Sequence, residues 1–147
     1  MKSKANIYKK YNIKNDQIDT KRSFKKKDKI DIIYVNYKKN EEIIDSIKSF
    51  IRLINKTKYI GCIFVVDNSF NDLNKFHTGK LIDFCINSSE ESPHKINYLP
   101  VIKNIGFGAG CNIGSKIGNS NYILFLNCDT DFSISSPKMF EEMLDQF

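Results

Sequence analysis

The segment Lys29–Tyr37, with the sequence KIDIIYVNY, is followed some twenty residues later by Ile60–Val66, with the sequence IGCIFVV. Both runs are rich in β-branched and aromatic residues, which is typical of buried strands. Between them, apolar residues recur at helical spacing: Ile43, Ile44, Ile47, Phe50, Ile51 and Ile54. A strand, a helix and a second strand within about forty residues form a βαβ unit, whose two strands are parallel. The sequence therefore predicts a parallel α/β sheet.

Several further elements are expected around this unit. Asn40 is the predicted cap of the first helix. A short helix is expected within Asn71–Phe84, and the polar segment Asn87–His94 is interpreted as a loop. Lys95–Ile102 predicts a weak strand, at an edge of the sheet because Pro100 has no amide donor for a central ladder. The turn and helix after it are expected to end near Gly118.

The segment Tyr122–Asp131, with the sequence YILFLNCDTD, changes abruptly from apolar to polar. Its first five residues predict a strand buried on both faces. The carboxylates that follow stand where open α/β sheets bind ligands, just past the carboxyl end of a strand. Pro137 suits the first turn of a last helix, with an apolar stripe of Met139, Phe140, Met143, Leu144 and Phe147.

These elements predict an α/β protein with a Rossmann-like, three-layer α/β/α architecture and a mainly parallel sheet of about four strands, spanning residues 30–147. Residues 1–29 hold eleven Lys or Arg against three Asp or Glu, and the remainder holds twelve against fourteen. The basicity thus belongs to an amino-terminal tail. We interpret it as a flexible, solvated extension in preference to a nucleic-acid arm, and peripheral membrane contact is the alternative.

The composition also bounds the compartment. No apolar run approaches the length of about 18 residues that a membrane span needs. The lysine-rich amino terminus lacks the apolar core of a secretory signal, so we expect a cytoplasmic location, or a peripheral one at the inner face of the membrane. The four cysteines show no C-x-x-C spacing and are expected to be reduced and mostly buried: Cys62, Cys85, Cys111 and Cys128.

Glycines punctuate the stretch from residue 104 to residue 118. Gly106-x-Gly108-x-Gly110 departs from the G-x-G-x-x-G fingerprint of dinucleotide sites in its spacing and in its place along the chain, so we reject that function. Gly106, Gly110, Gly114 and Gly118 also fall every fourth residue. On a helix, such a stripe permits close backbone approach. Either packing on the sheet or a bound ligand accounts for it.

Asp67 and Asp129 each follow an apolar strand. In a parallel sheet both emerge at the carboxyl edge. Two such carboxylates beside a glycine-rich helix start suggest a phosphate, sugar or metal site. A hard cation such as Mg²⁺ or Mn²⁺ suits carboxylate oxygen together with diphosphate oxygen. Asp131 is either a second metal ligand or a turn residue.

Four blocks carry a family resemblance: IYVNY at 33–37, VVDNS at 65–69, NIGFGAGCNIG at 104–114 and LFLNCDT at 124–130. In this order and at these separations, the chain from about Ile30 to Phe147 resembles the family 2 glycosyltransferases with a GT-A fold. It is most similar to their bacterial rhamnosyltransferase-type branch.

The resemblance implies binding of a nucleoside-diphosphate sugar. The first-strand end and the Asp-Asn-Ser block would hold the nucleoside, and the Asn-x-Gly-Phe block would lie near the donor. The implied nucleotide-sugar-binding residues are Asn36, Tyr37, Asp67, Asn68, Asn104, Gly106, Phe107, Asn112 and Asn127.

The family's D-x-D motif maps to Asn127-Cys128-Asp129, with Asp129 as the ligand of Mn²⁺ or Mg²⁺. Asn127 replaces the first acidic residue, as is common in this branch, and Cys128 stands where the branch usually has proline. A shifted frame, Asp129 to Asp131, spells a literal D-x-D. We prefer the first frame because it directly follows Leu126, and we keep Asp131 as a possible second ligand.

The implied reaction is a metal-assisted, inverting sugar transfer to a saccharide or lipid-linked acceptor. Such a transfer needs a general base, which in the family lies well beyond the D-x-D motif, and no residue of this chain matches it. We therefore expect a donor-binding part without its acceptor-binding half, inactive alone. The Tyr122–Leu126 strand would then form an open sheet edge and invite self-association or a partner chain.

Two other functions remain as alternatives. One is a non-catalytic nucleotide-sugar-binding module, or a decayed or split transferase subunit. The other is a nucleotidyltransferase-like enzyme on a related sheet. The second lacks support, because no glycine-rich loop with Arg or Lys follows the first strand.

Overall fold

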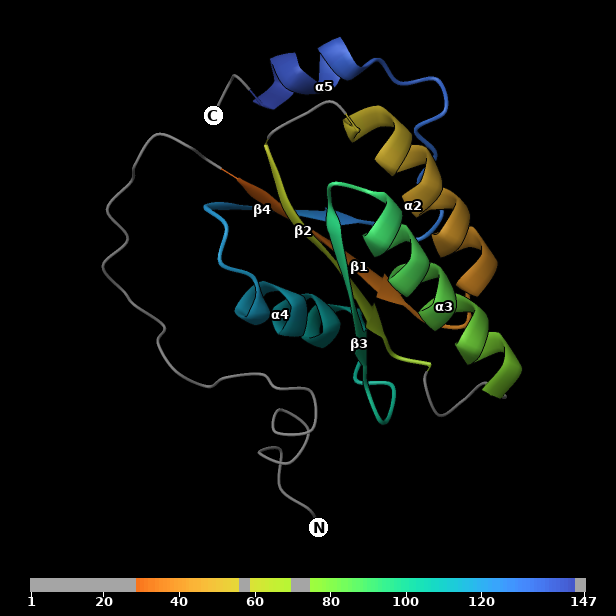
Figure 1. The fold of residues 1–147 in the computed structure, drawn as a ribbon. Coiled ribbons are helices and arrows are strands. Elements are labelled where there is room, and N and C mark those ends of the chain that lie inside the picture. The colour runs from red at the N-terminus through yellow and green to blue at the C-terminus, as the bar shows by residue number, and fades with distance from the viewer. Residues whose placement is uncertain (1–28, 56–58, 70–74, 145–147) are drawn as a thin grey trace.

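The computed structural model describes residues 29–55, 59–69 and 75–144. Four parallel strands form one sheet in the order β3-β2-β1-β4 (Figure 1). Their bounds are Ile30–Asn36 for β1, Ile60–Asp67 for β2, Lys95–Pro100 for β3 and Tyr122–Leu126 for β4. The predicted α/β, Rossmann-like class is confirmed, and β3 takes the expected edge position. The predicted tail lies outside the described residues, apart from Lys29.

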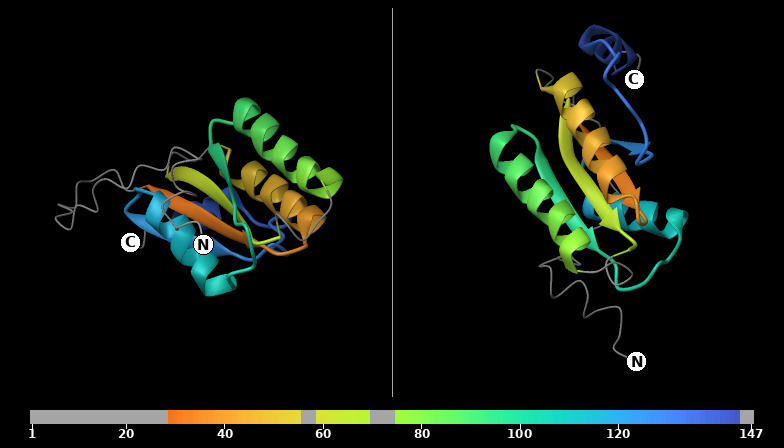
Figure 2. Two further views of the ribbon diagram at one scale, coloured as in Figure 1. Left: turned by 90° about the horizontal axis from the view of Figure 1, so that it is seen from below. Right: turned by 90° about the vertical axis from the view of Figure 1, so that its right-hand side faces the viewer.

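Helices cover both faces of the sheet, as two views show (Figure 2). Helices α2 (Asn40–Ile54) and α3 (Lys75–Glu91) lie on one face, and α4 (Phe107–Ile117) lies on the other. Alternate strand residues supply the two cores, with Ile32, Tyr34, Ile63 and Val65 facing α2 and α3, and Ile33, Val35, Phe64 and Val66 facing α4. Helix α5 (Pro137–Leu144) joins the first core through Phe140, whose ring centre lies 5.8 Å from that of Phe50.

Strand β1 lies at the centre of the sheet, and all seven of its residues are buried. Its pairing with β2 shifts register between Ile30 and Ile32, so β2 carries an extra residue there. The carboxylate of Asp31 fills this irregularity by accepting a hydrogen bond from the Cys62 amide at 2.9 Å. It also accepts the amide of Ser120, at 3.0 Å, and its hydroxyl, at 2.8 Å. Asp31 thereby ties β1 to β2 and to the segment before β4.

The packing of α4 on the sheet explains most of the glycine stripe. A methyl carbon built on Gly110 would lie 2.7 Å from Cγ1 of Val35, and one on Gly114 would lie 2.7 Å from Cγ2 of Ile33. A methyl carbon on Gly118 would collide with the Asp31 carboxylate. Three of the four glycines therefore serve close packing on the sheet. Gly106 has open space around its Cα and a φ of 83°, so this packing does not account for it.

Strand β4 differs from the expectation of burial on both faces. Ile123 is 40% exposed and Phe125 is 46% exposed, whereas Tyr122, Leu124 and Leu126 pack partly against the α2 and α3 core. The apolar run was misleading because β4 is an edge strand, and α4 packs over β1 and β2. The open edge that the resemblance implied is present in the described sheet.

Three local predictions were wrong. Helix α3 continues through the expected loop to Glu91, because buried Leu81 and Cys85 anchor one of its faces and its polar residues lie outside. Asn40 does not cap α2, since its side-chain oxygen accepts a hydrogen bond from Asn36 and the cap position belongs to Lys39. In the predicted stripe of α5, Phe140 is buried as expected but Met139 and Met143 are exposed, and Phe147 lies outside the described residues.

The cysteines are as expected, with Cys85, Cys111 and Cys128 buried, Cys62 half-buried and all four free. Among the described helices, none combines the length and the apolar character needed to cross a bilayer.

Candidate functional site at the carboxyl edge of the sheet

A buried polar network closes the carboxyl ends of β1 and β2. Asn36 and Asp67 are register partners, and neither has exposed surface. The Asn36 amide donates to Oδ1 of Asp67 at 3.0 Å. The amide and hydroxyl of Ser69 donate to the same oxygen, at 2.9 and 2.6 Å, and the Tyr98 hydroxyl donates to Oδ2 at 2.5 Å. Four donors therefore satisfy the buried Asp67 carboxylate, which fits the rule for buried polar groups.

The sequence analysis did not assign three members of this network to the candidate site: Asn40, Ser69 and Tyr98. The Asn36 amide also donates to Oδ1 of Asn40 at 2.6 Å and to the Ser69 hydroxyl at 3.3 Å. Ser69 belongs to the quoted VVDNS block, so its proximity to Asp67 was a usable signal. Tyr98 lies in β3, and only the pairing of β3 with β2 brings it to Asp67.

Asn68 links this network to the start of α4. Its side chain is 2% exposed, and its amide donates to the Gly106 carbonyl at 3.2 Å. Its Oδ1 is buried and accepts no hydrogen bond from the described residues. Before α4, Oδ1 of Asn104 accepts from the Gly106 amide at 2.9 Å, and no side chain of the described residues caps the helix. Within the described part of the chain, no side chain therefore bonds to the first-turn amides of α4, which lie next to the buried, unsatisfied Oδ1 of Asn68.

The other residues predicted on the donor side are exposed. Tyr37 is 42% exposed and Phe107 is 54% exposed, and the Lys38 ammonium lies 5.0 Å from the centre of the Tyr37 ring. Asn112 is exposed on α4. The structure therefore separates the predicted residues into a buried group, Asn36, Asp67 and Asn68, and an exposed group around it.

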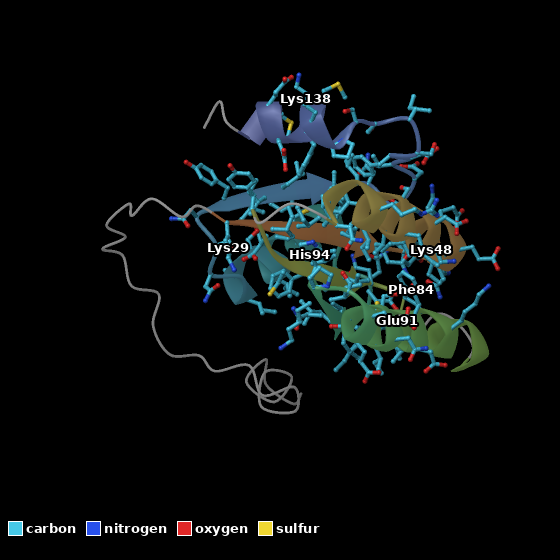
Figure 3. All side chains as sticks on the ribbon, turned by 45° about the horizontal axis from the view of Figure 1, so that its top comes forward. Lys29, Lys48, Phe84, Glu91, His94 and Lys138 are labelled. Carbon is cyan, nitrogen blue, oxygen red and sulfur yellow. The ribbon has the colours of Figure 1, made fainter. Side chains whose placement is uncertain are left out.

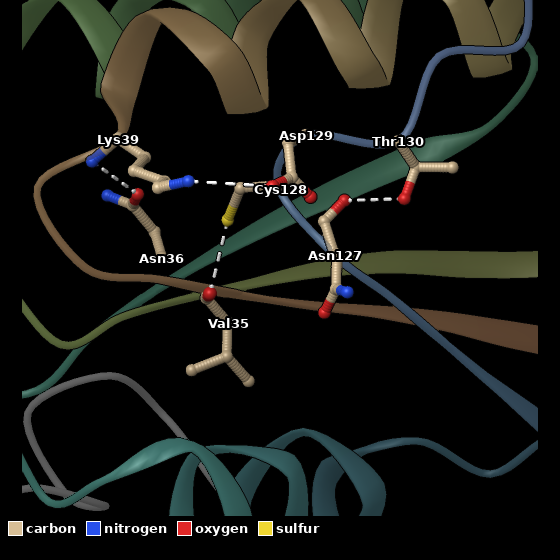
Figure 4. A network of polar contacts seen from close by, with 7 residues as sticks. All are labelled: Val35, Asn36, Lys39, Asn127, Cys128, Asp129 and Thr130. Atoms are coloured by element: carbon tan, nitrogen blue, oxygen red, sulfur yellow. Dashed lines mark hydrogen bonds and ion pairs between the residues drawn. The ribbon is translucent and has the colours of Figure 1, made fainter.

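The turn after β4 holds the predicted D-x-D-like motif (Figure 4). The Cys128 thiol is buried and donates to the Val35 carbonyl at 3.2 Å, which binds this turn to β1. Burial, reinforced by the neighbouring charge of Asp129, raises the pKa of the Cys128 thiol to about 12. The thiol therefore stays protonated at neutral pH, and Cys128 acts as a structural contact. Asn127 is exposed, and its carbonyl accepts from the amide and hydroxyl of Thr130.

The two candidate metal carboxylates have different surroundings. The Asp129 side chain is 62% exposed, and its Oδ2 lies 3.5 Å from the Lys39 ammonium. Asp131 accepts hydrogen bonds from the Ser133 amide at 2.9 Å and its hydroxyl at 2.7 Å, and these bonds lower the pKa of Asp131. Asp131 is therefore engaged in a local turn, while Asp129 faces Lys39 and solvent.

This donor set limits how a divalent cation could be held. No group of three or more His, Cys, Asp or Glu suited to a metal occurs in residues 29–55, 59–69 and 75–144. An exposed single carboxylate does fit Mg²⁺ or Mn²⁺ when substrate phosphates and water complete the shell. Asp129 fits a cation that is held jointly by one protein carboxylate and by the phosphates of a substrate.

A groove also lies between the last turns of α2 and α3, near Lys48, Phe84 and Glu91 (Figure 3). Its lining contains none of the predicted site residues, and comprises Lys48, Ile51, Arg52, Asn55, Ser88, Glu91 and Ser92. The Lys48 ammonium sits 5.8 Å from the centre of the Phe84 ring. The groove is thus separate from the polar carboxyl edge.

The arrangement defines a Rossmann-like α/β domain with a GT-A-like fold and a polar carboxyl edge. Among 37 similar solved chains is the crystal structure of S. aureus TarS 1–349, with a TM-score of 0.58 and 16% sequence identity. The match covers 80% of this chain and 32% of that one, so this chain spans about a third of that neighbour. At this identity the likeness shows the fold alone. No family model and no curated protein matches the sequence.

Proposed function

We propose that this chain binds a nucleoside-diphosphate sugar at the carboxyl edge of its sheet and serves as the donor-binding part of a glycosyltransferase. The observation that carries the proposal is the register pairing of Asn36 with Asp67, with the Asn127–Asp129 turn on the other side of β1. Polar groups from three parallel strands thus gather where open α/β sheets bind ligands, in a glycosyltransferase-like fold.

Within this proposal, the buried and exposed residues have different roles. Asn36 and Asp67 position the loops after β1 and β2, because their polar atoms are already bonded to protein. Tyr37 offers an exposed aromatic ring on which a nucleoside base can stack. Asn68, Asn104, Gly106 and Phe107 lie at the start of α4, Asn112 lies one turn further along this helix, and Asn127 precedes Asp129 in the turn after β4. Uncapped amides at a helix start favour an anionic group such as a diphosphate.

Asp129 would hold Mn²⁺ or Mg²⁺ together with oxygens of the diphosphate. A cation bound there would offset the negative charge that develops on the leaving diphosphate during an inverting transfer. The chain's own residues orient the donor, and we assign the general base to none of them. We further propose that the acceptor is a saccharide or a lipid-linked saccharide, and that a separate acceptor-binding half binds it.

Titration calorimetry with UDP, dTDP and GDP, with and without Mn²⁺, tests the donor site. We expect one nucleotide to bind in a Mn²⁺-dependent manner, and Asp129→Asn to remove that dependence. Asp131→Asn is the matched control, since Asp131 is committed to Ser133. Absence of binding by all three nucleotides would refute the donor-site assignment.

A non-catalytic nucleotide-sugar-binding module is the second candidate, because the described edge offers binding groups without an assigned base. Incubation with nucleotide-sugars and a panel of acceptors separates the two functions. Sugar transfer that is lost in Asp129→Asn supports the transferase. Nucleotide binding without transfer, alone or with a partner chain on the open β4 edge, supports the module.

A further inference from the structure

The Lys39–Asp129 ion pair places a cation at the carboxylate where the proposed function needs a metal. The Lys39 ammonium lies 3.5 Å from Oδ2 of Asp129 (Figure 4). The sequence analysis did not single out Lys39, which follows β1, whereas Asp129 follows β4. Their proximity results from the parallel pairing of these two strands.

The backbone of Lys39 is fixed from both sides. Its amide donates to Oδ1 of the buried Asn36 at 3.2 Å, and its carbonyl accepts the Ile43 amide of α2 at 3.0 Å. Lys38, just before it, has a φ of 58°, a left-handed conformation that few residues other than glycine adopt. The turn therefore fixes the backbone of Lys39, and the residue that holds it there is Asn36, which also bonds to Asp67.

The side chain of Lys39, in contrast, reaches into solvent on a flexible stem. It is 49% exposed, and four methylene groups separate its ammonium from the fixed backbone. An exposed ion pair of this kind is weak, because solvent screens the two charges and two flexible side chains must be held in one geometry. A divalent cation with diphosphate oxygens around it can therefore replace the ammonium at Asp129.

We propose that Lys39 is the resident counter-ion of Asp129 in the ligand-free protein, and that a divalent cation must displace its ammonium to reach this carboxylate. This inference rests on the proposed cation at Asp129. It predicts that the metal and the nucleotide bind cooperatively. Mn²⁺ alone must compete with the Lys39 ammonium for Asp129. A diphosphate supplies further oxygens for the metal and a new anionic partner for the ammonium. Metal and nucleotide then bind together more readily than either alone.

Binding of Mn²⁺ alone, followed by the loss of the free-ion signal in electron paramagnetic resonance, tests this competition without any nucleotide. We expect Lys39→Met to bind Mn²⁺ more tightly than the wild type, by up to about fivefold, the factor that corresponds to the strongest exposed ion pairs. The gain should disappear in Lys39→Met/Asp129→Asn. Lys138→Met is the matched control, because it removes another exposed pair of the same 3.5 Å length, with Glu142 of α5, and should bind Mn²⁺ as the wild type does.

Two results would overturn the proposal: an unchanged Mn²⁺ affinity in Lys39→Met, or a gain that persists when Asp129 is also replaced. Repeating the titrations with UDP, dTDP and GDP separates this inference from the proposed function. Mn²⁺-dependent nucleotide binding with no effect of Lys39→Met would refute the counter-ion role alone. A gain in Mn²⁺ affinity that depends on Asp129, with no nucleotide binding, would support the counter-ion role and refute the donor site.

Discussion

The same substitution at two positions of α4 should change stability in opposite directions. Gly114→Ala places a methyl carbon 2.7 Å from Cγ2 of Ile33 and 3.2 Å from both Cγ1 and Cδ1. Favourable carbon contacts begin at about 3.5 Å, so all three contacts overlap. Ile33 is 1% exposed in the central strand and has little room to move. Gly108→Ala, in the first turn of the same helix, meets no heavy atom within 4 Å.

The magnitudes follow from two opposing effects. Over-packing in a well-packed core costs about 1–3 kcal/mol, and replacing glycine by alanine in a helix returns about 1 kcal/mol. Because the Ile33 side chain is confined, we expect Gly114→Ala to lower the free energy of unfolding by about 1–2 kcal/mol. Gly108→Ala escapes the clash and should raise it by about 0.4–1 kcal/mol.

Urea unfolding followed by circular dichroism measures both variants. For an m-value of about 1.5 kcal/mol/M, the midpoint should fall by roughly 1 M in Gly114→Ala and rise by a few tenths in Gly108→Ala. Ile33→Ala provides a further check, since the cavity it leaves accommodates the added methyl group. In that background Gly114→Ala should be neutral or stabilising. An equal cost in both backgrounds, or a destabilised Gly108→Ala, would refute the packing explanation of the stripe.

Two further predictions concern pH and the sheet edge. Burial raises the pKa of Cys85 and Cys128 to about 12 from 9.0. The folded state is therefore stabilised in full below pH 9, where the thiols are protonated in both states, and the free energy of unfolding should fall as the pH rises from 9 towards 12. Urea midpoints at pH 8, 9 and 10 measure this fall. A smaller fall in Cys128→Ser than in the wild type would assign the effect to the Cys128 thiol. Phe125 is 46% exposed on β4, whose outer edge pairs with no described strand. It should promote concentration-dependent association in sedimentation velocity, and Phe125→Lys should abolish that association. A monomeric wild type at high concentration would contradict the role of this edge.

Local sequence patterns were sufficient to predict much of the fold. The alternation of apolar strands with an amphipathic helix in residues 29–66 predicted the parallel sheet, because a parallel pair requires a crossover connection. The polar residues that end the apolar runs of β2 and β4 predicted the carboxyl edge as the candidate site, and both Asp67, the last residue of β2, and Asp129 lie there. The sequence also predicted the end of α4 near Gly118 and the start of α5 at Pro137.

Tertiary structure decided what each of these residues does. Asp67 and Asp129 looked alike in sequence, yet Asp67 is buried among four donors and Asp129 is exposed beside Lys39. The glycine stripe left packing and ligand binding open until the positions of Val35 and Ile33 were known. Burial, hydrogen-bond partners and ion pairs depend on residues that are distant in sequence and adjacent only in the folded sheet. Sequence periodicity determines which elements form, whereas the environment of each carboxylate arises from their packing.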